Sequence, residues 1–335
     1  MAVYPRAAMR AFPKPLALAF GLALAASAMA ASGEQRGLMA WPDLLERPRP
    51  RPDATISYGD DPLQIVDIWV PRGNGPHPTV LMVHGGCWQT EIADRNIMNW
   101  IAGDLRGRGI AVWNIDYRGV DRGGGNPTTF WDVGYAVDML PEYAERYQLD
   151  ISRIVAVGHS AGGHLALWAA GRPRLPIGSV LRSPNPQRIH AVVSLGGLPD
   201  LEEAATPPGS GCGTEVIARL TDGSFQETSV PRLAPLNIPQ VLINGLQDRI
   251  IPIHYAHNYA AKMHAAGDDV RVRMIDGAGH VELIAPESRA WAAAVEEIES
   301  ALHPRHPGEG RDLATRSHGT PPRDPGLRRG DEEAP

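Results

Sequence analysis

One short stretch constrains the fold of this chain more than any other. The apolar, β-branched run at residues 154–157 is typical of a buried strand, and it ends in Gly-His-Ser-Ala-Gly at residues 158–162. Apolar residues at helical spacing follow at 165–170. A serine at such a strand-to-helix corner has a crowded backbone, which glycines two residues away on either side relieve. The pattern therefore predicts that Ser160 presents its hydroxyl beyond the end of a sheet, at the start of a helix.

Two other segments place chemically useful groups at the ends of predicted strands. The apolar run 79–83 leads into His-Gly-Gly-Cys-Trp at 84–88, and consecutive glycines after a strand leave backbone N–H groups uncovered, as an oxyanion hole requires. Downstream, Asp248 follows the apolar run 241–245, and His280 follows the alternating run 270–275. The chain order Ser, Asp, His is typical of α/β-hydrolases rather than of chymotrypsin-like or subtilisin-like proteases.

With these motifs the chain resembles α/β-hydrolases of the carboxylesterase branch that carry an HGG-type oxyanion loop. That branch includes hormone-sensitive-lipase-like esterases, feruloyl-esterase-like proteins and bacterial kynurenine formamidases. The resemblance covers residues 54–302. It implies the α/β-hydrolase fold: a mostly parallel sheet with an antiparallel N-terminal hairpin, helices on both faces and a small cap.

By this resemblance Ser160 is the nucleophile, His280 the general base and Asp248 the acid that orients His280. Such chemistry needs all three groups, because a serine hydroxyl attacks only when a base takes its proton and the base needs a carboxylate to fix its tautomer. His280 follows the Gly-rich residues 277–279, a flexible loop that can bring the ring over the strand ends. Asp276 is the main alternative acid, but its closeness to His280 in sequence favours a turn former.

The resemblance also implies an oxyanion hole formed by the N–H of Ala161 with those of Gly86 and Cys87. Many relatives carry a third glycine where this chain has Cys87, which changes the shape of the pocket more than the chemistry. Trp88, the residue after it, is expected to line an acyl or alcohol pocket and so to bind substrate.

The remaining apolar segments predict one α/β domain over residues 54–302, with an antiparallel edge hairpin at its start. Because helices separate the later strands, parallel pairing with right-handed crossovers is expected. Residues 199–237 are rich in Pro and Gly and predict either a small cap over the site or a solvent loop. The expected hairpin strands are 55–58 and 63–70, further strands are 110–117 and 190–195, and helices are 93–108 and 128–147.

The two ends of the chain have different compositions from the domain. Residues 1–30 combine a basic start, an apolar run and an Ala-Met-Ala end, which predicts a secretory signal peptide and an exported, periplasmic or secreted protein. The apolar run is shorter than the ~20 residues that span a bilayer, so a stable membrane span is not expected, and an uncleaved anchor is the alternative. Residues 31–53 are predicted to be a Pro-rich linker, and residues 303–335, poor in apolar side chains, a disordered tail.

Composition excludes other classes of function. With 43% hydrophobic residues and a net charge of −6, the chain can build one large core and has no electrostatic reason to bind nucleic acid. No cluster of His and Cys has the spacing of a metal site, so neither a metal nor another cofactor is expected. The two cysteines, Cys87 and Cys212, can pair in an oxidising compartment, but the sequence leaves their redox state and the oligomeric state open.

These observations predict a serine hydrolase that cleaves small carboxylic esters through an acyl-enzyme, without a cofactor. The alternatives are a kynurenine-formamidase-like amide hydrolase and a peptidase of the prolyl-oligopeptidase type, which is disfavoured because no propeller-sized domain precedes the core. A catalytically inactive binding module is a third alternative, less favoured because all three members of the triad are present.

Overall fold

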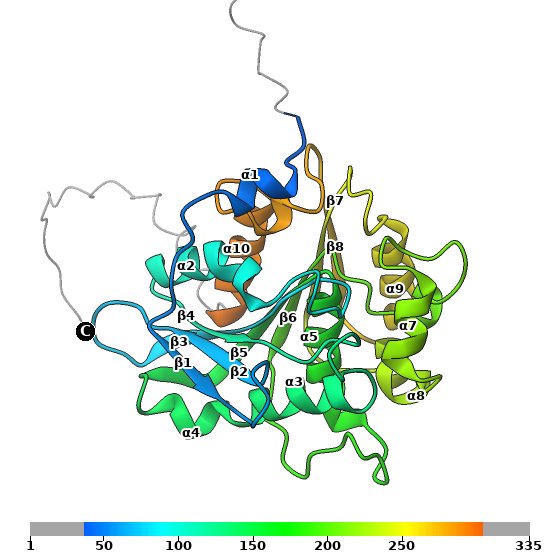
Figure 1. Cartoon of the computed structure of the whole chain (residues 1–335), viewed down its shortest axis with the longest axis horizontal. Coiled ribbons are helices and arrows are strands. Elements are labelled where there is room, and N and C mark those ends of the chain that lie inside the picture. Colours follow the sequence, from blue (N-terminus) through cyan, green and yellow to red (C-terminus); the bar gives the residue numbers. More distant parts are fainter. Residues whose placement is uncertain (1–36, 304–335) are drawn as a thin grey trace, which may run out of the picture. The chain divides into compact units, whose positions relative to one another are not determined.

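The computed structural model describes residues 37–303 of the chain, which form an eight-stranded sheet with helices packed around it (Figure 1). The predicted signal peptide and, apart from His303, the predicted tail lie outside these residues. The strand order in the sheet is β1-β2-β4-β3-β5-β6-β7-β8. The strands are β1 (Ala54–Ser57), β2 (Ile65–Trp69), β3 (His77–Val83), β4 (Ala111–Ile115), β5 (Leu149–His159), β6 (Ala191–Leu195), β7 (Gln240–Gly245) and β8 (Val270–Ile275).

The strand directions confirm the predicted mixed sheet. Strand β2 pairs antiparallel with β1 on one side and with β4 on the other. All later pairs, from β4–β3 across to β7–β8, are parallel. Six parallel strands, β3 to β8, therefore end at the same edge of the sheet, and the loops that follow them meet there.

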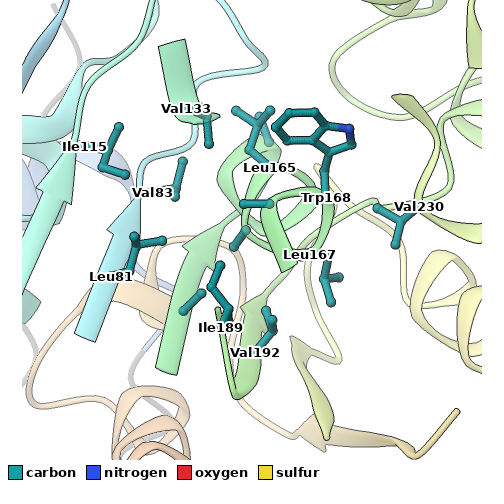
Figure 2. Close-up of a cluster of buried hydrophobic side chains, with 14 of the residues drawn as sticks. Leu81, Val83, Ile115, Val133, Leu165, Leu167, Trp168, Ile189, Val192 and Val230 are labelled. Atoms are coloured by element: carbon teal, nitrogen blue, oxygen red, sulfur yellow. The ribbon is translucent and has the colours of Figure 1, made fainter. Parts of the chain in front are cut away.

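Two apolar layers, one on each face of the sheet, form the core. Alternate residues of β3 point to opposite faces, because side chains alternate along a strand: Leu81 and Val83 belong to one layer, Val80 and Met82 to the other. Figure 2 shows part of the first layer, in which Leu165 and Trp168 of the helix after β5 belong to the same cluster as Leu81 and Val83 of β3. The helices of the first layer include α3 (Thr128–Asp138), α5 (Ala161–Gly171) and α9 (His254–Ala265); those of the second include α2 (Asn99–Gly107) and α10 (Arg289–Leu302).

The helix predicted over residues 128–147 is divided in two. The first part is α3 and the second is α4 (Leu140–Ala144), with Met139 at the junction. Pro141 lies in the first turn of α4, where its missing N–H does no harm, whereas inside a continuous helix it would remove a hydrogen bond. The predicted single helix was therefore wrong at this proline.

The structure differs from the predicted linker over residues 38–53. Residues Trp41–Leu45 form helix α1, and its Leu44 is fully buried in the same apolar layer as α10. Arg47 forms an ion pair with Glu287, and the side chain of Asn99 donates a hydrogen bond to the carbonyl of Pro50 (3.2 Å). The buried Leu44, the ion pair and the hydrogen bond together hold this segment on the domain.

The segment 199–237 is structured rather than a free loop. It contains α6 (Leu201–Ala204), α7 (Thr214–Thr221), α8 (Phe225–Thr228) and a short 3-10 helix at Val230–Leu233. Asp200 forms an ion pair with Lys262 of α9, and Asn258 of the same helix donates a hydrogen bond to Glu203 (2.7 Å). Within residues 37–303, no helix combines the length and the apolar character needed to cross a membrane.

Replacing Leu44 tests whether α1 belongs to the folded domain. We expect Leu44→Ala to lower the free energy of unfolding by about 2–5 kcal/mol, because a buried leucine leaves a cavity when truncated. Leu45, one residue further and 40% exposed, is the matched control, and Leu45→Ala should change that free energy by less than about 0.5 kcal/mol. Urea unfolding followed by circular dichroism measures both. Equal, small effects of the two variants would mean that α1 is not docked.

Candidate active site

Ser160 lies at the corner between β5 and α5, as the motif predicts. Its backbone has φ 53° and ψ −122°, a conformation that residues other than glycine rarely adopt. The two flanking glycines are required: a Cβ on Gly158 would lie 2.0 Å from the carbonyl oxygen of Gly162, and one on Gly162 would lie 2.1 Å from that of Val83. The N–H of Ser160 donates to the carbonyl of Leu195 on β6 (2.8 Å), which fixes the corner to the neighbouring strand.

Asp248 and His280 form a buried hydrogen-bonded pair. The Nδ1 of His280 lies 2.6 Å from Oδ2 of Asp248. The other carboxylate oxygen accepts the N–H groups of Ile250 (2.8 Å) and Ile251 (2.9 Å), so the loop after β7 holds the carboxylate in one orientation. The ring of His280 is thereby directed with Nδ1–H toward the acid, which leaves Nε2 free to act as a base.

Asp276, the alternative acid, lies elsewhere. Its Oδ1 accepts a hydrogen bond from the side chain of Gln247 (2.9 Å), and that glutamine also accepts the N–H of Gly277 (2.9 Å). These bonds hold the turn after β8. The structure brings Asp248, rather than Asp276, to His280.

Ser160 and His280 line one pocket of about 320 Å³ at the carboxyl ends of the parallel strands. The walls are mainly apolar, and His280 and the adjacent His159 supply the only ionisable side chains among the lining residues. The complete lining is Trp41, Leu45, Gly86, Cys87, Ile92, Ala93, Ile97, His159, Ser160, Gly211, Ile250 and His280. In the described part of the chain, no group of three or more His, Cys, Asp or Glu side chains could hold a metal ion.

The loop after β3 brings Gly86 and Cys87 to this pocket. Gly86 has φ 101°, which favours glycine, and a Cβ there would lie 2.9 Å from the side chain of Ala93. Cys87 has φ 52° although it carries a side chain. Among residues 37–303, no acceptor receives the N–H of either residue or that of Ala161, the first residue of α5. Two of these three N–H groups belong to Gly86 and Cys87, which line the pocket.

A network of buried charged side chains holds the start of this loop in place. His84 Nε2 lies 2.9 Å from one oxygen of Asp116, and Arg95 donates to the other (2.9 Å) and to Asp67 (2.8 Å). Burial alone would raise the pKa of Asp116, but the hydrogen bond from His84 and the charges of His84 and Arg95 outweigh it and lower that pKa. The carboxylate stays ionised and fixes the residue that begins the Gly-Gly turn.

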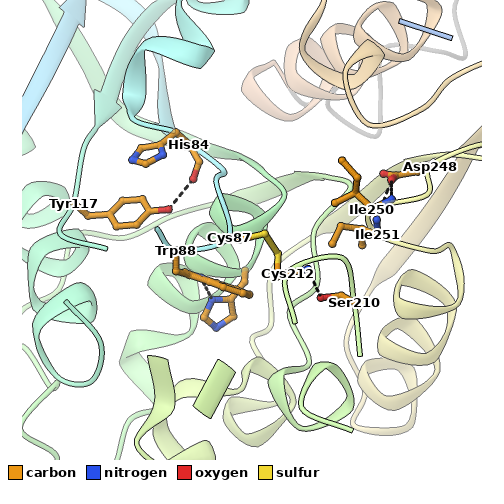
Figure 3. Close-up of a disulfide and its surroundings, with 10 residues drawn as sticks. His84, Cys87, Trp88, Tyr117, Ser210, Cys212, Asp248, Ile250 and Ile251 are labelled. Atoms are coloured by element: carbon orange, nitrogen blue, oxygen red, sulfur yellow. Dashed lines mark hydrogen bonds between the residues drawn. A yellow bond between two sulfur atoms is a disulfide. The ribbon is translucent and has the colours of Figure 1, made fainter. Parts of the chain in front are cut away.

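Trp88 does not line the pocket, and its predicted role in substrate binding was wrong. The side chain, labelled in Figure 3 beside the disulfide, is fully buried, and its indole N–H donates to Nδ1 of His164 on α5 (3.3 Å). Burial lowers the pKa of His164 to about 4, so this ring is neutral and can accept the bond, while its Nε2 donates to the carbonyl of Thr228 (2.8 Å). With φ 54°, the backbone of Trp88 turns the ring into the core.

The pocket wall contains residues that the sequence did not single out. Trp41 of α1 contacts the rings of His159 and His280 edge-on, with centroids 6.2 and 6.3 Å away. Leu45, from the same helix, and Ile250, from the loop after β7, add apolar surface. The only signal for α1 was a tryptophan and two leucines just before a Pro-Arg repeat.

His159, next to the serine, holds the loop that carries His280. Its Nε2 lies 3.1 Å from the backbone carbonyl of His280, and the ring is buried. Burial, with a further contribution from the nearby His280, lowers the pKa of His159 well below its ordinary value. The ring is therefore neutral and donates Nε2–H to that carbonyl.

The two cysteines form a disulfide between Cys87 and Cys212, with Cα atoms 5.3 Å apart (Figure 3). The bond joins the loop after β3 to the segment 199–237 across 125 positions of sequence. This answers the question that the sequence left open, and it explains why Gly211 reaches the pocket.

Comparison with known proteins agrees with this architecture. The BD-FAE family matches residues 66–263. Esterase LipC from Mycobacterium tuberculosis (strain ATCC 25618 / H37Rv) is 29% identical over 67% of this chain and 58% of its own length. A probable isoprenylcysteine alpha-carbonyl methylesterase from Oryza sativa subsp. japonica is 26% identical over 74% of this chain and 63% of its own length. The chain thus spans less than two thirds of either relative.

A solved structure of Esterase B from Lactobacillus rhamnosis with a tributyrin phosphonate inhibitor has the same fold, with a TM-score of 0.64 and 17% identity over 76% of this chain and 88% of that one. This likeness confirms the α/β-hydrolase fold. Since the family match extends over more than half of the sequence and over the serine corner itself, the chain belongs to the BD-FAE family.

Proposed function

We propose that this protein is a serine esterase that cleaves small, neutral carboxylic esters through an acyl-enzyme. The hydrogen bond of 2.6 Å between His280 and the doubly anchored Asp248, in the pocket that Ser160 lines, is the observation that carries the proposal. A bound and oriented histidine beside a serine at a strand-to-helix corner is the arrangement that activates a hydroxyl for attack.

In the proposed reaction, the Oγ of Ser160 attacks the ester carbonyl carbon while Nε2 of His280 takes its proton. Asp248 stabilises the resulting imidazolium. The carbonyl oxygen becomes an oxyanion, and the free N–H groups of Cys87, Gly86 and Ala161 are the donors available to it. The C–O bond then breaks, His280 gives its proton to the departing alcohol, and a water molecule, activated by the same histidine, releases the acid and regenerates the serine.

The pocket supports a small and neutral substrate. Its volume of about 320 Å³ limits what can be enclosed, and its apolar walls from Trp41, Ile97 and Ile250 favour uncharged groups. A charged substrate would lie in this pocket without a side chain of opposite, permanent charge. The esterase names of the relatives and of Esterase B support ester hydrolysis as the reaction.

Amide hydrolysis of the kynurenine-formamidase type uses the same catalytic groups and is the second candidate. Cleavage of an amide needs protonation of a poorer leaving group, and His280 is the one acid that the described lining offers besides its buried neighbour His159. The ester is therefore the better substrate for this geometry.

Substitution of the two acids tests the proposed triad. We expect Asp248→Asn to lower kcat for p-nitrophenyl acetate by about 10⁴-fold, because the histidine loses the partner that fixes its tautomer. The matched control is Asp276→Asn, which removes a carboxylate from a turn nearby and should leave kcat within about twofold. Steady-state kinetics on the three proteins measures this, with Ser160→Ala as the background.

Labelling with a fluorophosphonate probe tests the nucleophile itself, without turnover. The wild type should be labelled at Ser160, and Ser160→Ala should not be. An Asp248→Asn variant with unchanged kcat, or an Asp276→Asn variant with a large loss of kcat, would show that the wrong acid has been assigned.

A series of p-nitrophenyl esters tests the substrate size. We expect acetate and butyrate to exceed decanoate in kcat/KM, because Cys87 and its disulfide narrow the pocket beside the oxyanion loop. N-formylkynurenine, run beside them, should be a poorer substrate than either short ester. A preference for decanoate would contradict the small pocket, and a preference for the formamide would make the second candidate the function.

We also propose that the protein is exported and cleaved after Ala30. The composition of residues 1–30 supports this, and so does the Cys87–Cys212 disulfide, since such bonds persist in oxidising compartments. N-terminal sequencing of protein from a periplasmic or secreted fraction should give Ala31 as the first residue. Full-length protein confined to the cytoplasm would contradict export.

A further inference from the structure

The disulfide connects the two loops on which the proposed chemistry depends. Cys87 lies in the loop after β3 that offers free N–H groups to the pocket, and Cys212 lies in the segment 199–237. Cys212 is only 8% exposed, and its neighbour Gly211 lines the same pocket as Cys87. Figure 3 shows the bond between the oxyanion loop on one side and the residues around Asp248 on the other.

On the first side, Cys87 needs an external restraint. It follows Gly86 in a turn where both residues have positive φ, and Cys87 does so with a side chain. Conformations of this kind persist only where the surroundings determine them. The next residue, Trp88, is held by burial and by His164, but the side chain of Cys87 is half-buried at the edge of the pocket, and its covalent partner is Cys212.

On the second side, hydrogen bonds continue from the disulfide to the base. The N–H of Gly211 donates to the carbonyl of Ile250 (2.8 Å), and the N–H of Ile250 donates to Oδ1 of Asp248 (2.8 Å). The other oxygen of Asp248 holds His280 (2.6 Å). Gly211 approaches Ile250 so closely that a Cβ would lie 2.8 Å from its carbonyl oxygen, so this contact depends on glycine.

We propose that Cys212 is a positioning residue for catalysis: its disulfide with Cys87 holds the oxyanion-binding N–H groups in register with the Asp248–His280 pair. This inference rests on the proposed function, because the register matters only if an oxyanion forms beside His280. The disulfide is expected to stabilise the transition state. There, the N–H donors must already face the carbonyl oxygen while His280 is placed to accept the proton of Ser160.

Activity should therefore depend on the redox state of the pair. A dithiol such as dithiothreitol breaks the S–S bond: each sulfur gains one electron and one proton, and the dithiol is oxidised to its cyclic disulfide. Reduction frees Cys87 from Cys212 and leaves Ser160, His280 and Asp248 chemically unchanged.

The experiment compares the oxidised full chain with Cys212→Ser and with the wild type after reduction, all assayed with p-nitrophenyl acetate well below their melting temperatures. We expect kcat to fall by about 10- to 100-fold in both altered forms, with KM within about twofold, because a contact used only in the transition state lowers kcat and kcat/KM together. Reoxidation of the reduced wild type should restore kcat. The reduced wild type keeps the test valid if Cys212→Ser does not fold.

Two controls separate positioning from stability. Arg232→Ala breaks an exposed ion pair with Glu202 in the same segment but not at the disulfide, and it should leave kcat unchanged. Dithiothreitol should not lower kcat of Cys212→Ser any further.

Three results would overturn the proposal. A lower melting temperature with unchanged kcat in the two altered forms would mean that the disulfide only stabilises the fold. A raised KM with unchanged kcat would make it only a wall of the pocket. An oxidised wild type with no more esterase activity than Ser160→Ala would refute the proposed function itself, and the positioning role with it; that failure is seen in the wild type alone, before any cysteine is altered.

Discussion

The close approach of backbones at the carboxyl end of β5 is the constraint on which the site depends. Gly158 and Gly162 let the chain reverse direction so tightly that the first turn of α5 touches the carbonyls of Val83 and His84 at the end of β3. This contact puts the serine corner and the loop after β3 side by side, and the hydrogen bond from Ser160 to β6 fixes the corner from the other side. The loops after β7 and β8 then bring their side chains to the site that the ends of β3, β5 and β6 define.

Around this corner, charged groups are buried only where they are paired. Asp116 is held by His84 and Arg95, and Asp248 by His280 and two backbone N–H groups. Since an unpaired charge in the interior is costly, each of these carboxylates has one favourable orientation. The neutral rings of His159 and His164 complete the arrangement, because burial keeps them uncharged and therefore able to bond specific carbonyls. Electrostatic pairing, as well as steric contact, thus orients the groups of the site.

Local patterns predicted the parts of the fold that local physics determines. The serine corner, the strands and the antiparallel hairpin follow from apolar periodicity and glycine placement, and the structure has them at those positions. The sequence could not show where a side chain turns when the backbone is unusual, so Trp88 was expected in the pocket and lies in the core. It also could not pair Cys87 with Cys212 or bring α1 to the site, because both depend on contacts between distant parts of the chain. Asp248 was preferred to Asp276 because Asp276 lies too close to His280 in sequence, and the structure places Asp248 against His280.

The position of α1 has a consequence for where the working unit begins. The family match starts at residue 66, and the sheet starts at Ala54, so either boundary separates the domain from Trp41 and Leu45. A fragment cut there would keep every group proposed to make or break a bond. It would also open one side of the pocket to water and leave a cavity where the side chain of Leu44 packs in the apolar layer. One wall of the pocket and the proposed catalytic groups thus come from separate stretches of chain, and variation in the short stretch before the domain can alter that wall without changing Ser160, Asp248 or His280.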